Sequence, residues 1–147
     1  MTVEQSPPSV SLPEWLGIEV LASSAGAAVA RLRPRPEAHN YRGVVAGGSL
    51  ATLADVAMAV AANSALGSER WSITSGLELH YLRPARGVVT AYARAVHTGR
   101  TRVVVEGSLT DEAGKAVVQA LGTFVVVEAT ETDHVAPDLS VRTDGHD

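Results

Sequence analysis

The chain has 147 residues, a length that suits one domain and allows a sizeable core. Hydrophobic residues make up 46% of it and charged residues 19%, which is typical of a folded globular protein and not of a disordered one. The net charge of −4, without a basic helical face, argues against nucleic acid or an anionic membrane as the main partner, and the lack of cysteine excludes disulfides, thiolate metal sites and a cysteine nucleophile.

The N-terminal segment 1–11 is rich in serine and proline, and we expect it to be flexible. It shows neither a basic start nor an apolar stretch of the kind found in signal peptides, so we expect a cytoplasmic protein. LPEWLG at 12–17 predicts a helical turn. The segment 18–34 alternates toward its end and predicts a strand, and a polar connection follows it.

The most apolar segment is GVVAGGSLATLADVAMAVAAN at 43–63, which predicts a long helix starting near the pair Gly47-Gly48. Apolar residues lie on all sides of this helix, and a helix of that kind is buried on all sides. We therefore expect it to be the central helix of the domain.

Four strand-like runs joined by short turns follow the helix, at 71–84, 87–99, 101–111 and 115–129. The predicted layout is α+β, with one antiparallel sheet wrapped around one helix. A single sheet covers only part of a helix that is apolar all round, so we expect a second copy to cover the rest. The domain is expected to span 12–129, and the polar segment 130–147 to be a disordered tail.

A single charged residue, Asp55, lies in the middle of this apolar helix. Burying an ionised carboxylate costs several kcal/mol unless partners compensate, so stability alone would favour alanine or leucine there. A structural role for Asp55, as a cap or at a polar interface, is one interpretation. The other is catalytic, because unpaired N–H groups at Gly47-Gly48 could bind a developing oxyanion while the acid acts as nucleophile or general base.

Three stretches together resemble the hotdog-fold acyl-CoA thioesterases of the PaaI-like (phenylacetic acid degradation) group: HNYRGVVAGGSLATLADVAMAVAAN, LELHYLRPARG and HTGRTRVVVEGSLTDEAGKAVVQALGTFVVV. The family pattern is N-x-x-G-x-x-H-G-G, an Asp nine positions after that His, a strand ending F-L-R-P, and G-R-[RT] at a later hairpin. The resemblance covers about residues 15 to 128. It implies a hotdog fold with a five- to six-stranded antiparallel sheet, and hydrolysis of a thioester.

The resemblance places Asp55 at the position of the catalytic acid and Gly47 at the position whose N–H polarises the carbonyl. Asn40 occupies the Asn of the pattern, and Thr74 aligns with a Ser/Thr that helps to position water in some members. Family active sites form at a dimer interface, so we expect Asn40 and Gly47 to face the acid of a partner chain, in a homodimer that often doubles to a homotetramer.

Contacts to coenzyme A are expected at Gly48, at Arg83 and in the turn around Gly99, Arg100, Thr101 and Arg102. Arginine suits such a site because its guanidinium offers a fixed fork of donors to phosphate. Coenzyme A enters as part of the substrate, and no other cofactor is expected. The histidines show no metal-ligand spacing, so we expect no metal site.

One departure from the family pattern is serious, because the family His is Ala46 here. His39, His80 and His97 are candidates to replace it, although a loop, a strand face and a hairpin explain them equally. The departure leaves two alternatives open: a non-hydrolytic protein that binds thioesters, and a hotdog hydratase or dehydratase.

The acyl group, and its delivery on coenzyme A or on an acyl carrier protein, also stay open at this point. The shape of the acyl pocket is expected to depend on apolar side chains such as Leu50, Leu53, Met58 and Leu79.

Overall fold

The computed structural model describes residues 10–129, so most of the predicted N-terminal segment and all of the predicted tail lie outside the described residues. Helices and strands follow the order α1 (Leu12–Leu16), β1 (Ile18–Ser24), β2 (Ala27–Leu32), a 3₁₀ turn (Pro36–Ala38), α2 (Gly47–Ser64), β3 (Arg70–Tyr81), β4 (Val89–Thr98), β5 (Arg102–Thr110) and β6 (Ala116–Glu128).

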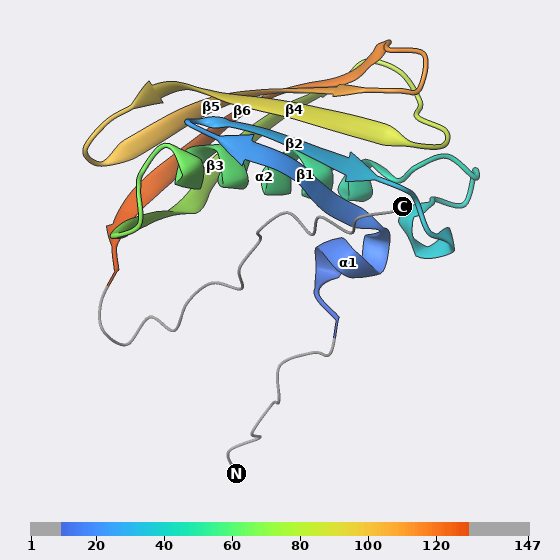
Figure 1. The fold of residues 1–147 in the computed structure, drawn as a ribbon. Helices are drawn as coiled ribbons and strands as arrows, with labels where there is room; N and C mark the ends of the chain where they lie inside the picture. The colour runs from blue at the N-terminus through green and yellow to red at the C-terminus, as the bar shows by residue number, and fades with distance from the viewer. Residues whose placement is uncertain (1–9, 130–147) are drawn as a thin grey trace, which may run out of the picture.

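The strands form one six-stranded sheet in the order β1-β2-β4-β5-β6-β3, with every neighbouring pair antiparallel. The sheet curves over α2, which lies along its concave face (Figure 1). This arrangement confirms the predicted hotdog fold, and the four strands expected after the helix are all present.

The N-terminal part of the sheet differs from the prediction, because 18–34 forms two strands and not one. The two strands are joined by the two-residue turn Ala25-Gly26, and both residues have a positive φ, 48° and 86°. A type I′ turn requires this backbone conformation. The Gly26 N–H also donates to Ser64 Oγ at 2.9 Å, so the last turn of α2 holds the hairpin in place.

Small residues let the sheet approach α2 closely. A Cβ atom added at Gly107 or Gly122 would lie 3.1 or 3.2 Å from Met58 Sδ, so these two glycines leave the space that the methionine fills. Leu53, Met58 and Phe124 are fully buried in this layer. The core is therefore made from α2 and the inner face of the sheet.

One side of α2 is only partly covered within the described chain. The residues that remain partly exposed there are Ala51, Thr52, Asp55, Val56 and Ala59. Strand β3 runs beside them at the edge of the sheet, and in residues 10–129 it pairs with β6 alone. Exposed apolar side chains lie on or next to this strand: Ile73, Leu77, Tyr81 and Leu82.

Within the described range, none of the helices has the length and apolar character needed to cross a membrane.

Candidate active site

Asp55 is held by a residue of the edge strand. Thr74 Oγ1 donates a hydrogen bond of 2.8 Å to Asp55 Oδ1. A bulge at Ser75 shifts the register of β3 directly after Thr74, where the strand passes the middle of α2. Among residues 10–129, no Lys, Arg or His lies within ion-pair distance of Asp55, and its second oxygen has no hydrogen-bond partner. The structure thus brings two predicted residues together and leaves one carboxylate oxygen free to act.

A second polar contact between α2 and β3 was not predicted from the sequence. Asn63 Oδ1 accepts hydrogen bonds of 2.9 Å from both the N–H and the hydroxyl of Ser72, which is buried. Together with the Asp55–Thr74 bond, this contact fixes the helix against the edge strand at two places. In the sequence, the one feature that could have indicated this contact is the polar Asn63 near the end of an apolar helix.

The start of α2 presents two free donors. Ala46 is the N-cap and has no side-chain cap bond, and no acceptor within the described part of the chain meets the N–H of Gly47 or Gly48. Both glycines are exposed. Free N–H groups at the positive end of a helix favour a negatively charged oxygen, so both donors are available to one, and the binding of an oxyanion there stays a prediction.

Asn40 shapes the loop that leads to these donors. Its Oδ1 accepts hydrogen bonds from the N–H of Arg42 at 2.9 Å and of Val44 at 3.4 Å, which makes an Asx-type turn. The backbone of Asn40 also bonds Val44 and Gly43, each at 2.9 Å. The side-chain oxygen is therefore used within the loop, and a direct catalytic role for Asn40 stays a prediction.

None of the three candidate histidines lies beside Asp55. The His39 ring contacts the backbone oxygen of Arg35 at 3.0 Å, in the loop before α2. His80 lies 2.8 Å from Glu78 Oε1 on the outer face of the sheet, and His97 packs against Gly99 near the β4–β5 turn. Among residues 10–129, no histidine takes the place of the family His, which is Ala46 in this chain.

A cavity of about 370 Å³ lies beside the start of α2, and its lining is mostly apolar: Val44, Val45, Gly47, Leu50, Tyr81, Leu82, Arg83, Pro84 and Ala85. Of the four side chains expected to shape an acyl pocket, Leu50 lines this cavity. Leu53 and Met58 are core residues with no exposed surface, and Leu79 packs against that core. The cavity therefore takes its shape from the loops at both of its sides more than from the helix.

The predicted site residues fall at two opposite ends of the sheet. Thr74 lies in one transverse row with Phe124 and Val103, next to the turn from Gly99 to Arg102. Tyr81 lies in a row with Val118 and Leu109 at the other end, where Arg83 and Gly47 also lie. Figure 1 shows the β4–β5 turn and the start of α2 far apart.

Asp55 and Gly47 cannot meet at one carbonyl group within a single protomer. They are eight residues apart on one helix, which corresponds to about 12 Å along its axis. The expectation that the acid comes from a partner chain is consistent with this separation.

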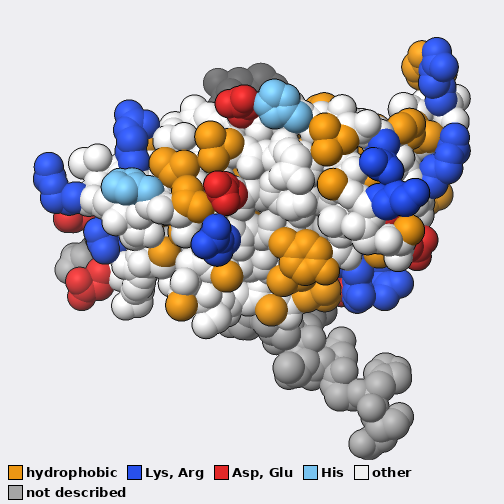
Figure 2. Space-filling model, turned by 90° about the horizontal axis from the view of Figure 1, so that it is seen from above, with side chains coloured by type: hydrophobic (Ala, Val, Ile, Leu, Met, Phe, Trp, Pro, Cys, Tyr) orange, Lys and Arg blue, Asp and Glu red, His pale blue; other side chains and the backbone are white. Residues whose placement is uncertain are grey.

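A larger hollow lies elsewhere, on the outer face of the sheet. It has a volume of about 790 Å³ and is lined by residues of five strands, but by none of the predicted catalytic residues. Figure 2 shows this face, with hydrophobic side chains scattered among arginines, carboxylates and histidines. Its charged groups pair with each other, as Glu78 with His80 and Arg94 with Glu106, so we do not assign the active site to this hollow.

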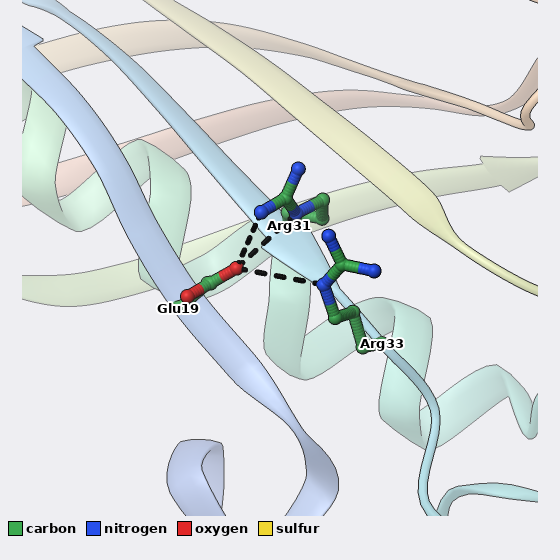
Figure 3. Close-up of polar contacts among 3 residues, drawn as sticks. All are labelled: Glu19, Arg31 and Arg33. Carbon is green, nitrogen blue, oxygen red and sulfur yellow. Dashed lines mark hydrogen bonds and ion pairs between the residues drawn. The ribbon is translucent and has the colours of Figure 1, made fainter. Parts of the chain in front are cut away.

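Two of the three arginines in ARLRPRP are held in an ion-pair cluster (Figure 3). Glu19 Oε1 lies 2.7 Å from Arg31 Nη2 and 3.8 Å from Arg33 Nε. Glu19 lies in β1, Arg31 lies in β2, and Arg33 directly follows β2, so the pairs connect the two strands at the surface. Both arginines are paired with a carboxylate and do not form a phosphate clamp.

Comparisons with known proteins agree with this fold. The sequence profile of the thioesterase superfamily matches residues 42–118. A 1,4-dihydroxy-2-naphthoyl-CoA hydrolase of Listeria monocytogenes serotype 1/2a (strain 10403S) is 32% identical over 120 residues, which are 80% of this chain and 96% of that protein.

Two solved structures are also similar to this chain in sequence and fold. A Bacillus halodurans protein crystallised with CoA is 35% identical, with a TM-score of 0.71 over 79% of this chain and 75% of that one. The Escherichia coli PaaI protein from the phenylacetic acid degradation operon is 26% identical, with a TM-score of 0.75 over 83% of this chain and 88% of its own. The chain belongs to the thioesterase superfamily and is a hotdog-fold thioesterase.

Proposed function

We propose that this thioesterase hydrolyses an acyl- or aryl-CoA thioester to a free acid and coenzyme A, with Asp55 as nucleophile or general base. The observation that carries the proposal is the Asp55–Thr74 bond of 2.8 Å, which holds a carboxylate on the partly exposed side of α2, where no residue of 10–129 forms an ion pair with it. The Gly47 N–H polarises the thioester carbonyl. As general base, Asp55 takes a proton from water, the water oxygen becomes bonded to the acyl carbon, the C–S bond breaks, and the departing thiolate takes that proton. As nucleophile, Asp55 would bond to the acyl carbon while the C–S bond breaks, and water would then hydrolyse the anhydride and supply the proton for the thiolate.

The complete site needs two protomers. Strand β3 has 12 residues and an unpaired edge in the described chain, and exposed apolar side chains lie along it. An edge of this length is unfavourable unless it is covered, and the β3 of a second copy can pair with it antiparallel. A two-fold axis near the middle of β3 would place the Thr74 end of one protomer beside the Tyr81 end of its partner. Asp55 of one chain would then face Gly47 of the other.

The same two-fold explains the separation of the proposed CoA contacts. Arg83 lies at one end of the sheet, whereas Gly99, Arg100, Thr101 and Arg102 lie at the other. Pairing through β3 would bring Arg83 of one protomer toward the β4–β5 turn of its partner. Exposed arginines from two chains would then meet the phosphates of one CoA molecule.

The cavity beside Gly47 favours an aryl or short acyl group. Its lining is mostly Val, Leu, Pro and Ala, and its volume of about 370 Å³ is at the small end of ligand sites. The Listeria monocytogenes relative is named for a naphthoyl-CoA substrate, and the PaaI protein comes from a phenylacetic acid operon. We infer a PaaI-like preference for an aromatic acyl group.

The test is thiol release from a panel of aryl-CoA, short-chain and long-chain acyl-CoA substrates, followed with a chromogenic thiol reagent. We expect the highest kcat/KM for a member with an aromatic acyl group. Long-chain substrates are expected to be poorer because most of a long acyl chain would lie outside this cavity. Absence of turnover on the whole panel would contradict hydrolysis, and a clear preference for long chains would contradict the assigned cavity.

Ala46 supports one alternative function, in which the protein binds a CoA thioester without hydrolysing it. On our proposal, Ala46→His raises an existing kcat or leaves it unchanged, because a thioester has a good leaving group and the acid is already in place. On the alternative, the unaltered protein binds CoA without turnover, and Ala46→His creates activity that was absent. Steady-state kinetics on both proteins, with CoA binding by calorimetry, separate the two.

Two further expectations concern the assembly and its location. We infer that two dimers associate into a homotetramer and that the enzyme acts in the cytoplasm. Light scattering during gel filtration would determine the mass of the assembly, and a dimer as the largest species would contradict the tetramer.

A further inference from the structure

The first two carbonyl groups of α2 each accept a hydrogen bond from a side-chain hydroxyl. Thr52 Oγ1 donates to the Gly48 carbonyl oxygen at 2.8 Å, which is a local bond within the first turns of the helix. Tyr81 Oη donates to the Gly47 carbonyl oxygen, also at 2.8 Å. Tyr81 comes from the last position of β3, so its bond connects the start of the helix to the end of the edge strand.

The Tyr81 bond acts on the peptide that carries the Gly48 N–H, because the carbonyl of Gly47 and the nitrogen of Gly48 belong to the same peptide group. A donor at the carbonyl oxygen polarises the peptide and strengthens its N–H as a donor in turn. The Gly48 N–H is exposed and has no acceptor in the described range, and a Cβ atom at Gly48 would meet nothing within 4 Å. There is space for a ligand atom at this N–H.

The Thr52 bond does not have this effect. It polarises the next peptide, whose N–H belongs to Ser49, and that N–H already donates to the Ala46 carbonyl at 3.0 Å. The two hydrogen bonds from hydroxyl groups therefore have the same length but polarise different N–H groups. One strengthens a free donor, and the other strengthens a donor that is already used.

Tyr81 also adds a restraint to the start of the helix, where the Ser49 hydroxyl and the Ala46 N–H already donate to the Ala38 carbonyl at 2.9 and 2.8 Å. The N-cap Ala46 has no side-chain oxygen, and two consecutive glycines allow wide backbone freedom. The Tyr81 ring packs over Gly47, at 3.6 to 3.7 Å from where a Cβ atom would lie. Partial burial raises the pKa of the Tyr81 hydroxyl above its usual value, which favours the protonated form that donates the hydrogen bond.

We propose that Tyr81 is a positioning residue that aims and strengthens the Gly48 N–H, and that this N–H joins the Gly47 N–H as a second donor to the oxyanion of thioester hydrolysis. The inference rests on the proposed function. When a water oxygen adds to the acyl carbon, the carbonyl electron pair moves onto the oxygen, and it returns when the C–S bond breaks and the thiolate is protonated. Since this negative charge exists only along the reaction, the contribution of Tyr81 falls on kcat and not on substrate binding.

The test compares three variants that each lose one hydroxyl: Tyr81→Phe, Thr52→Val and Tyr92→Phe. Tyr92 is a matched control because it is 52% exposed, against 50% for Tyr81, and lies on the outer face of the sheet. We expect Tyr81→Phe to lower kcat by about two- to tenfold, the equivalent of one hydrogen bond, with KM unchanged. The two controls should keep the kcat of the unaltered protein, and thermal unfolding should show that all three variants are folded.

An unchanged kcat in Tyr81→Phe, or a higher KM at the same kcat, would overturn the assignment. An equal loss in Thr52→Val would also overturn it, because the effect would then belong to the helix start in general. If the unaltered protein turns over no thioester, the proposed function and this inference fail together. If it is active and Tyr81→Phe matches it, the inference alone fails.

Discussion

Asp55→Asn is expected to lower kcat for thioester hydrolysis by about 10²- to 10⁴-fold, the usual contribution of a catalytic acid or base. Asparagine has nearly the same shape as aspartate, and its carbonyl oxygen can still accept the hydrogen bond that Thr74 donates at 2.8 Å. The variant therefore removes the charge and the proton-accepting oxygen while the contact between α2 and β3 remains. Thiol release under saturating substrate, together with circular dichroism, measures the effect.

A matched control for this prediction is Glu106→Gln. Glu106 is a carboxylate on the outer face of the sheet, where it lies 3.5 Å from Arg94 Nη2, and such an exposed pair contributes little to stability. Its change to the amide should leave kcat unaltered. If Asp55→Asn is as active as the unaltered protein, Asp55 is a structural residue and the proposed mechanism is wrong.

The sequence was sufficient to predict most of the fold. The four strands after α2 are marked by alternating apolar residues and by short turns that contain glycine, and the structure confirms all four. The β1–β2 hairpin was missed because its turn, Ala25-Gly26, lies in a run of Ser and Ala with few strand-forming residues. The positive φ of Ala25 depends on the packing of the hairpin against the end of α2, which periodicity does not show.

The sequence was less informative about the site. Asp55 was identifiable because it is the one charge in an apolar helix, whereas Thr74 entered through the family resemblance. The bond from Tyr81 to Gly47 joins residues that are 34 positions apart, and it depends on where β3 ends. The separation of the site residues at two ends of the sheet could not be seen before the strand register was known.

Because these residues are separated, we expect each active site to combine Gly47 of one chain with Asp55 of its partner. Gly47→Pro removes one proposed oxyanion donor at the first position of α2, where proline fits a helix well. Ala46 has φ −62° and ψ 143°, the extended conformation that a residue before proline adopts. We expect the Gly47→Pro and Asp55→Asn homodimers both to be nearly inactive.

Heterodimers of these two variants, purified through two different affinity tags, should recover activity. If each site combines Gly47 of one chain with Asp55 of its partner, one of the two sites in such a heterodimer is intact, and about half of the activity returns. A second heterodimer pairs an unaltered chain with a chain that carries both substitutions. In the two-chain arrangement both of its sites are damaged, so it should be nearly inactive.

A site contained within one chain predicts the opposite pair of results, because the unaltered chain would then keep a whole site and the two single variants would have none. The two heterodimers contain the same substitutions in the same number, so differences in folding or substrate affinity cannot imitate the contrast between them. Inactivity of the first with activity of the second would contradict the pairing of protomers through β3. The activity ratio of the two heterodimers therefore shows whether the Gly47 and Asp55 of one active site come from one chain or from two.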